Sequence, residues 1–449
     1  SDLFIESKSL GFFVQGQFDW NNRLFVNGAV RWDNNSAQGE NLGVKAYPKF
    51  GASFVALEGQ GVFNTLRFRG GWGQSGTLPG TNDALALVGI QQVAFEGTDQ
   101  LGITPDRPGN PFLEPETGTE WEAGFDLAMV SDRIGLTFTY YDQTTTNTVV
   151  SKNLAPSVGF PNQVFTNIGQ IDNDGLEVEL DALIFATENF NWDVRLLGSR
   201  NNNNIAQLVD PIIYGLGGSS QRHQEGLPFG SYVQPQVVIQ ADGTAGVLTC
   251  DETPGTWGPG DTPGAKEAFC DPLDSARWNG DPTPRYEGSF QTTFQLFKYI
   301  QLYALFDFQQ GHQRMNNTGD FMCGFLGGGL NGGICLEGMT QNGVETNGDR
   351  TLIVAESSRI GTEAPWILDA NWGKFRTAQI RFDMPPSVTR FLKVNGLQIQ
   401  LIGENLVTWT DYNGWDPEIN WAGQNEASVA EFLTLPPNRR FIGTINIFF

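Results

Sequence analysis

Apolar and polar residues alternate along much of this chain, in stretches of about ten positions. The clearest stretch, LEVELDAL at 176–183, has an aliphatic residue at every second position and carboxylates between them. Successive side chains of a β-strand point to opposite faces of its sheet. The pattern therefore predicts strands with one apolar face and one polar face.

Thirteen such stretches can be assigned. They span residues 10–20, 23–33, 47–57, 64–74, 119–129, 133–144, 174–185, 190–200, 285–296, 299–309, 375–385, 396–406 and 440–449. The connections at 21–22, 58–63, 130–132, 186–189, 297–298 and 386–395 are short, and those at 34–46, 75–118, 145–173, 201–284, 310–374 and 407–439 are long. Short and long connections alternate throughout. Transmembrane barrels have short periplasmic turns and long extracellular loops, so the alternation predicts an all-β antiparallel barrel wall.

Two interpretations of this pattern differ in the medium that covers the aliphatic face. In a soluble sandwich a second sheet would cover it, whereas in a membrane barrel lipid covers it and the carboxylates line a watery lumen. Sorting of loops by length favours the barrel. Aromatic residues near the strand ends, such as Trp20, Trp72, Trp121 and Trp192, fit the girdles expected at the two membrane surfaces.

The composition is compatible with a barrel and excludes other classes. Hydrophobic residues make up 39% of the chain and charged residues 17%, and no apolar run reaches the length of a membrane-spanning helix. The formal net charge of −23 disfavours nucleic acid as a partner, because phosphate binding requires a basic surface. Much of the acidic excess lies in Gly- and Asn-rich stretches, which are interpreted as solvated loops.

The four cysteines fall into two local pairs, Cys250 with Cys270 and Cys323 with Cys335. Both pairs lie in Gly-rich stretches without a Cys-x-x-Cys spacing, so two disulfides in exposed loops are favoured over a metal site. The chain has only two histidines and no nucleophile elbow or phosphate-binding loop. The sequence thus predicts no enzyme activity, no cofactor and no metal.

Two groups of residues are candidates for contact with a ligand or partner. The carboxylates on the polar faces of two strands are expected to line the lumen: Glu120, Glu122, Asp126, Glu177, Glu179 and Asp181. The aromatic residues Trp409, Tyr412 and Trp415 are expected in an external loop, where they could stack on a sugar, pack beneath a partner, or pack within the loop itself. The DNDG stretch at 172–175 is interpreted as a turn.

Five segments give the chain a family resemblance. They read RWDNNSAQGEN (31–41), RFRGGWGQSG (67–76), NPFLEPETGTEWEAGFD (110–126), NIGQIDNDGLEVEL (167–180) and NLVTWTDYNGWDPEIN (405–420). Together, and in this order, they resemble segments of SusC/RagA-like TonB-dependent outer-membrane transporters. The last segment is the one most specific to that family.

The resemblance implies a place in the bacterial outer membrane and active import of a bulky nutrient, a glycan or an oligopeptide. It also implies a SusD-like surface lipoprotein and TonB as partners, with outer-membrane lipid around the wall. Such transporters have a 22-stranded barrel, an N-terminal plug and a TonB box. We expect residues 1–449 to form the C-terminal thirteen strands of such a barrel, with the plug and the TonB box absent from this chain.

Two alternatives remain open. A smaller closed barrel of fourteen strands is possible if FGSYVQPQVVIQ at 229–240 supplies one more strand. A barrel that serves as a surface scaffold or adhesin, without transport activity, is the alternative function.

Overall fold

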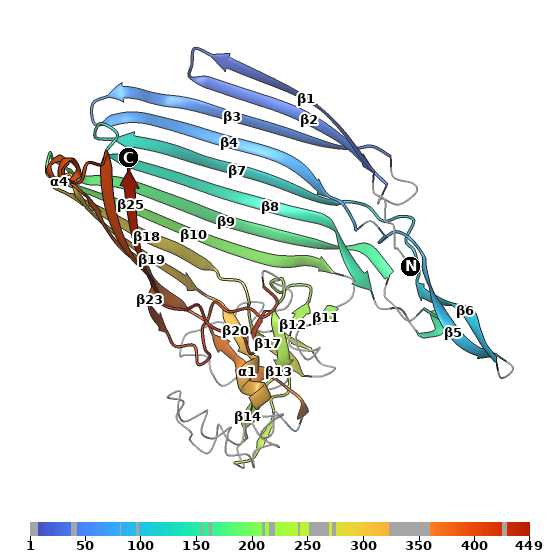
Figure 1. The fold of residues 1–449 in the computed structure, drawn as a ribbon. Helices are drawn as coiled ribbons and strands as arrows, with labels where there is room; N and C mark the ends of the chain where they lie inside the picture. Colours follow the sequence, from blue (N-terminus) through green and yellow to red (C-terminus); the bar gives the residue numbers. More distant parts are fainter. Residues whose placement is uncertain are drawn as a thin grey trace.

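The computed structural model describes residues 8–36, 43–80, 82–95, 98–152, 154, 156–160, 164–208, 212–214, 221–240, 243–250, 269–271, 275–322, 360–423 and 429–449. Thirteen strands form one antiparallel sheet whose order follows the chain (Figure 1). They are β1 (Ser9–Trp20), β2 (Leu24–Asn35), β3 (Lys45–Gln60), β4 (Phe63–Thr77), β7 (Glu116–Met129), β8 (Ile134–Lys152), β9 (Val164–Ala186), β10 (Phe190–Leu208), β18 (Tyr286–Leu296), β19 (Ile300–Gln310), β22 (Trp372–Asp383), β23 (Gly396–Thr410) and β25 (Arg440–Phe448). The sheet is curved and open, and β1 and β25 form its edges.

The predicted strands and the sorting of their connections are confirmed. Each of the thirteen predicted stretches coincides with one strand of the sheet. The short turns lie at one end of the strands and the long connections at the other (Figure 1). One short connection holds a helix, α4 (Pro386–Leu392). No helix in the described ranges is long and apolar enough to cross a membrane.

Several strands extend further toward the long-loop end than the sequence predicts. β8 continues to Lys152 and β9 begins at Val164, so the prediction of a loop over 145–173 was wrong for most of its length. These extensions read TTNTVVSK (145–152) and VFTNIGQIDN (164–173), with little regular alternation. Beyond the hydrocarbon neither face of a strand has to be apolar, so the pattern that identifies a strand is lost there.

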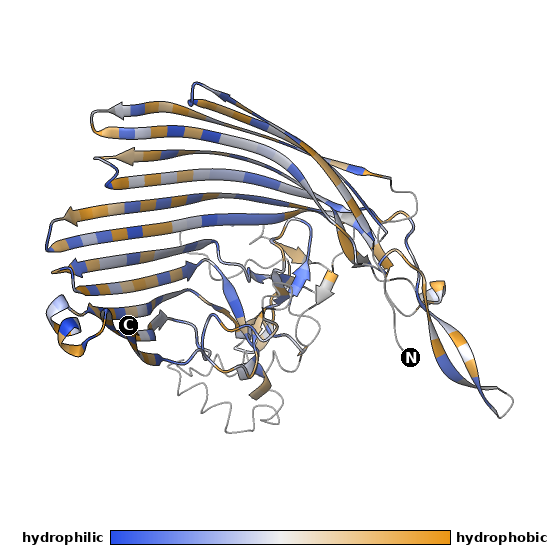
Figure 2. Cartoon of the chain, turned by 45° about the horizontal axis from the view of Figure 1, so that its top comes forward, coloured by the Kyte–Doolittle hydropathy of each residue, from blue (hydrophilic) through white to orange (hydrophobic). Residues whose placement is uncertain are grey.

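The register of the sheet separates an apolar face from a polar face. Val178 on β9 lies opposite Phe138 on β8, whereas Glu177 lies opposite Thr139 on β8 and Ser199 on β10. Figure 2 shows the resulting alternation of hydrophobic and hydrophilic positions along the strands. The polar face is the concave one, because a single hollow there is lined by side chains from β4 across to β22.

The apolar face carries aromatic pairs and exposed aliphatic residues. Phe306 and Phe375 stack across β19 and β22 with ring centroids 4.4 Å apart, and Leu401 is 52% exposed. The two buried apolar clusters found in the described part of the chain lie among the long connections. No protein layer therefore covers the apolar face of the described sheet, as expected for a surface in contact with lipid.

The long connections form smaller elements at one end of the sheet. β5 (Leu87–Phe95) and β6 (Thr98–Arg107) form a projecting hairpin, and η1 (Pro156–Val158) is a single turn. Three further sheets are present. The first consists of β11 (Ile212–Tyr214), β12 (Gln221–His223), β13 (Tyr232–Pro235), β17 (Ala276–Gly280) and β16 (Cys270–Asp271). The second pairs β14 (Val237–Ile239) with β15 (Ala245–Val247), and the third consists of β21 (Ile367–Asp369), β20 (Gln313–Asn316) and β24 (Ala430–Glu431). The helices α1 (Asn317–Asp320) and η3 (Ala364–Trp366) flank them.

This arrangement excludes the fourteen-stranded alternative. The stretch 229–240 forms β13 and β14, which belong to two of the small sheets and make no pair with the large one. Tyr232 at the start of β13 is fully buried, and its hydroxyl donates a hydrogen bond to the carbonyl of Val429. The same hydroxyl accepts a hydrogen bond from the backbone N–H of Met315 at 3.4 Å. Residue Tyr232 thus joins three long connections into one packed body.

The predicted disulfide between Cys250 and Cys270 is present. The second predicted pair, Cys323 and Cys335, lies outside the described residues. Close to the disulfide, the Arg277 guanidinium donates a hydrogen bond of 2.5 Å to the carbonyl of Thr249.

We expect the double substitution Cys250→Ser and Cys270→Ser to loosen this connection without reducing the amount of barrel in the membrane. The two cysteines are 20 positions apart in the sequence, and closing a loop of that size stabilises by roughly 3 kcal/mol. Tryptic cleavage after Arg277 should therefore accelerate in the variant. Unchanged cleavage kinetics would show that the surrounding loop packing holds the segment without the disulfide.

Candidate functional site

The six carboxylates predicted to line the lumen share one face of the sheet. Glu120, Glu122 and Asp126 lie on β7, and Glu177, Glu179 and Asp181 lie on β9, with β8 between them. The cross-strand register places all six on the concave side. A contact of any of them with a ligand remains a prediction.

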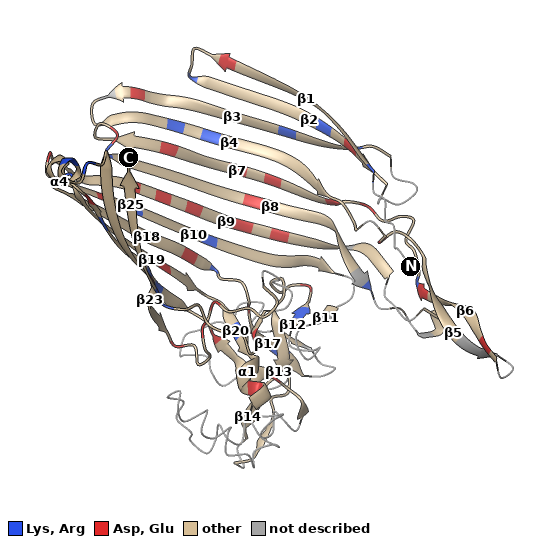
Figure 3. Cartoon of the chain, in the orientation of Figure 1, with Lys and Arg blue, Asp and Glu red and all other residues tan. Residues whose placement is uncertain are grey.

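The concave face is divided into sectors of opposite charge (Figure 3). Basic side chains dominate β2 to β4: Arg31, Lys45, Lys49, Arg67 and Arg69. Carboxylates dominate from β7 to β19, where Glu287 and Asp307 join the six named above. A second basic group follows on β22, with Lys374 and Arg376. Such a division gives the wall a field directed across the lumen.

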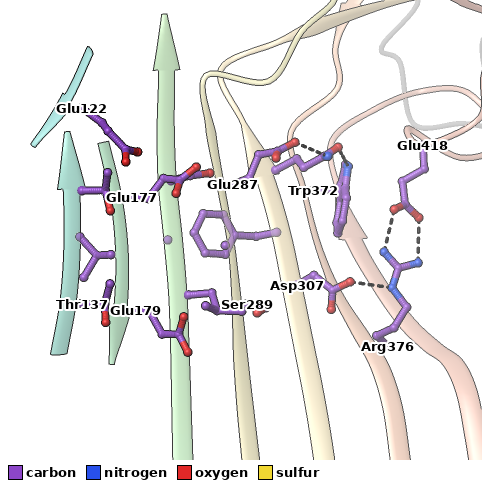
Figure 4. Close-up of a pocket in the computed structure, with 18 of the residues that line it drawn as sticks. Glu122, Thr137, Glu177, Glu179, Glu287, Ser289, Asp307, Trp372, Arg376 and Glu418 are labelled. Carbon is purple, nitrogen blue, oxygen red and sulfur yellow. Dashed lines mark hydrogen bonds and ion pairs between the residues drawn. The ribbon is translucent and has the colours of Figure 1, made fainter. Parts of the chain in front are cut away.

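A hollow of about 580 Å³ runs along the acidic sector (Figure 4). We call it the inner groove; its lining includes Arg69, Glu122, Thr137, Thr139, Glu177, Glu179, Ser199, Glu287, Ser289, Asp307, Gln309, Trp372, Arg376 and Glu418. A second hollow, nearer the long connections, shares four of these residues: Ser199, Glu287, Gln309 and Glu418. The two hollows therefore form one continuous path along the wall.

Only some of the carboxylates of the acidic sector are neutralised. Arg67 pairs with Asp126 at 2.6 Å, and Arg195 pairs with Glu179. In contrast, neither Glu122 nor Glu177 has an ion pair or a hydrogen bond within the described part of the chain. These two carboxylates face the groove as unpaired, solvated charges.

A polar chain continues the groove toward β22. Gln309 donates a hydrogen bond of 2.6 Å to Glu287 and accepts one of 3.1 Å from the indole N–H of Trp372. Trp372 is only 5% exposed. Its ring is also close to the cations of Lys374 and Arg376, at 5.2 and 5.3 Å from the centroid. The β22 side of the inner groove is thus held in place by a connected set of side chains.

The segment 411–423, which follows β23, is anchored to β22 by a buried ionic cluster. The ammonium of Lys374 lies 2.8 Å from Asp416 and 2.5 Å from Glu418, and its side chain is only 3% exposed. Arg376 pairs with Glu418 at 2.7 Å and with Asp307 on the groove wall at 2.8 Å. Burial alone would raise the pKa of the Glu418 carboxyl, but its hydrogen bonds to Arg376 and Lys374 lower that pKa below the usual value. The cluster fixes the segment over the end of the inner groove.

The three aromatic residues predicted in an external loop occupy three different environments. Trp409 lies in β23 opposite Gly373, on the same face as Val407, so its placement in a loop was wrong. Tyr412 is 6% exposed, and burial together with the nearby Glu431 raises the pKa of its phenol well above the usual value. Trp409 is 55% exposed on the strand, and Trp415 is 51% exposed and lies in the loop itself. Its contact with a partner remains a prediction.

The sequence analysis missed the cations of β22. Lys374 and Arg376 occur in the stretch WGKFRTAQIRF, which starts three residues before the predicted strand, and single basic residues of this kind give no sequence signal for a site. The acidic DPE of the family-like segment 405–420 is the signal that could have found them. Two carboxylates that fold into a buried position require cations from a neighbouring element.

The histidines do not form a metal site. His223 and His312 lie in separate long connections, and burial lowers the pKa of each to about 4. The described ranges contain no group of three or more His, Cys, Asp or Glu side chains arranged to hold a metal.

Comparison with known proteins agrees with this geometry. The family model described as "TonB dependent receptor-like, beta-barrel" matches residues 3–308. The chain belongs to this family. The family assignment confirms the predicted outer-membrane location and the prediction that the chain is not an enzyme.

Individual relatives refine the assignment. The TonB-dependent receptor P3 of Formosa agariphila is 26% identical over 435 residues, which cover 91% of this chain and 40% of that protein. SusC of Bacteroides thetaiotaomicron is 23% identical over 337 residues, covering 70% of this chain and 33% of that protein. The resemblance to SusC-like receptors is therefore confirmed, and the chain spans less than half the length of these relatives.

Solved structures confirm the fold. The RagAB peptide importer in its open-open state superposes with a TM-score of 0.76 over 99% of this TonB-dependent receptor chain and 47% of that one, at 18% identity. At this level of identity the similarity concerns the fold alone. It confirms the interpretation of the open sheet as part of a TonB-dependent barrel.

Proposed function

We propose that this chain forms the C-terminal wall of an outer-membrane transporter that imports a bulky nutrient, a glycan or an oligopeptide, with energy delivered through TonB. We further propose that a SusD-like surface lipoprotein covers the end of the barrel where the long connections lie. The single observation that carries the proposal is the continuous polar path from the long connections down the inner groove. A wall that served only as a scaffold has no need of a path of solvated, partly unpaired charges.

The names of the relatives support TonB-dependent import. SusC and the Formosa receptor P3 are named as TonB-dependent receptors, and RagAB is described as a peptide importer. The basis of selectivity in such a wall is binding and release by polar groups.

Growth and uptake measurements test this proposal. Deletion of the gene in its own host should abolish growth on the transported nutrient and uptake of its fluorescent derivative, and the full-length gene should restore both. Oligosaccharides and oligopeptides are offered separately, so that the cargo class is identified. Uptake should stop when a protonophore removes the energy source of TonB. A deletion strain that takes up every tested nutrient at the normal rate would favour the scaffold alternative.

The double substitution Glu177→Gln and Glu287→Gln tests whether the inner groove meets the cargo. Both carboxylates line the hollow, and a wall of one sign of charge raises the local concentration of opposite charge. We expect uptake of cationic members of the cargo class to slow several-fold, while neutral members enter at the normal rate. Because both side chains are solvated, the amount of protein in the outer membrane should not change. Equal slowing of both cargo types would show that these charges do not select cations.

A further inference from the structure

Two neighbouring short turns carry exposed aromatic residues together with lysine and arginine. The turn between β18 and β19 consists of Phe297, Lys298 and Tyr299, and α4 ends with Arg390, Phe391, Leu392 and Lys393. The backbone N–H of Asp383, just before α4, donates a hydrogen bond of 2.8 Å to the carbonyl of Tyr299. We call these seven residues the rim patch. Figure 1 shows α4 at the short-turn end of the sheet, and Figure 3 shows its basic residues.

The apolar members of the rim patch are unusually exposed for residues of their size. Phe391 is 85% exposed, Phe297 63% and Leu392 47%. In water, each exposed apolar side chain would lose the free energy that is gained when it moves into an apolar medium. The patch lies at the short-turn end of β18, β19, β22 and β23. Aromatic residues at this level are stabilised at the boundary between hydrocarbon and headgroups.

The cations of the rim patch make no ion pair within the described ranges. The side chain of Arg390 donates a hydrogen bond of 3.1 Å to the carbonyl of Pro386 in its own helix, which leaves its charge unneutralised. Lys298 and Lys393 also have positive φ angles, of 66° and 55°. Glycine or asparagine is favoured in that conformation. In the first turn asparagine fills positions 21 and 22, which correspond to Phe297 and Lys298. Turn geometry therefore does not by itself favour lysine at positions 298 and 393.

We propose that the rim patch binds the phosphate-bearing headgroups of anionic phospholipids in the inner leaflet of the outer membrane. The short turns of an outer-membrane barrel face the periplasm, so the patch lies at the level of that leaflet. The three cations contact lipid phosphates while the aromatic and aliphatic side chains enter the upper acyl region. The patch anchors the β18–β23 part of the wall, which also carries the ionic cluster on β22.

Native mass spectrometry of the full-length protein tests the charge component. The protein is titrated with phosphatidylglycerol and, separately, with phosphatidylcholine. We expect preferential retention of phosphatidylglycerol, and a loss of its affinity of roughly fivefold for each cation removed in the triple substitution Lys298→Gln, Arg390→Gln and Lys393→Gln. The matched control removes three positive charges at the long-loop end of the sheet, through Lys8→Gln, Lys152→Gln and Arg439→Gln. Equal binding of the two lipids by the unmodified protein, or an equal loss of affinity in the control, would overturn the proposal.

Photocrosslinking in intact cells tests the position of the patch. A benzophenone-bearing phenylalanine analogue at position 391 should form an adduct with phospholipid. An adduct with a periplasmic protein in place of lipid, or no lipid adduct at all, would show that α4 faces another occupant. This measurement does not depend on the charge substitutions or on transport activity, so its result stands even if the proposed import function fails.

Discussion

Replacing Lys374 with methionine should release the segment 411–423 from the wall at a cost of about 3–5 kcal/mol. The lysine side chain is 3% exposed and is the closest cation to Asp416, whose side chain is only 11% exposed. Methionine conserves much of the side-chain volume but leaves that carboxylate buried without its cation. An uncompensated buried charge is far more costly than the loss of an exposed ion pair, since water cannot reach it.

Limited proteolysis across 411–423 and denaturant unfolding in detergent micelles measure this effect. The matched control is Arg440→Gln, which breaks the pair between Arg440 and Glu404 at 2.5 Å. The side chain of Arg440 is 65% exposed, and such pairs contribute about 0–1 kcal/mol. We expect rapid cleavage of the segment only in Lys374→Met. Equal protection in both variants would mean that Arg376 alone holds the segment.

A second substitution separates charge from packing in the same cluster. Combining Lys374→Met with Asp416→Asn removes the orphaned carboxylate as well as the cation. The two changes should therefore be strongly non-additive, and the double variant should recover part of the stability that the lysine variant loses. Additive losses would show that the lysine acts through its contacts with Trp372 rather than through its charge.

The membrane-spanning part of the fold could be predicted from the sequence because the membrane imposes the same pattern on every strand. Hydrocarbon on one side and water on the other impose alternation, as in LEVELDAL at 176–183. The connection lengths then fix which end of each strand faces the cell surface. These two signals were sufficient for thirteen strands and their order.

Outside the membrane no face of a strand has to be apolar, and the predictions made from alternation fail there. DNDG at 172–175 was interpreted as a turn, but it lies within β9. Glycine occupies position 175 for another reason, since a Cβ there would come within 2.4 Å of the Tyr141 hydroxyl and 2.5 Å of the Arg200 carbonyl. The residue makes room for a ring that crosses the strand, which a local pattern cannot reveal.

The candidate site, like the fold, could be predicted from the sequence only in part. The carboxylates of β7 and β9 could be assigned to the lumen because alternation fixes the face of each side chain. The burial of Tyr412 and the ionic cluster around Lys374 could not be assigned, since they depend on the path of a long connection back onto the wall. Contacts between residues 42 positions apart, such as Lys374 with Asp416, follow from tertiary packing alone.

Replacing Val178 with arginine should prevent stable assembly of the wall in the outer membrane. Val178 lies on the apolar face of β9, opposite Phe138 and Gly198, in the part of the strand where alternation is strictest. An arginine on the lipid face near the bilayer midplane destabilises a barrel by roughly 2–4 kcal/mol. We expect a large fall in the amount of folded protein in outer-membrane fractions, measured by heat-modifiable migration on gels and by surface labelling.

Position 177 provides the control, because an arginine there tests the same residue type on the other face of the strand. Glu177→Arg introduces the same side chain one residue earlier, on the concave face, where water solvates it and the carboxylates of the acidic sector attract it. That variant should reach the outer membrane in normal amount. The two substitutions differ only in which face of one strand receives the charge, so opposite outcomes can arise only if lipid contacts one face and water the other. Comparable loss of folded protein in both variants would contradict lipid contact on the Val178 face.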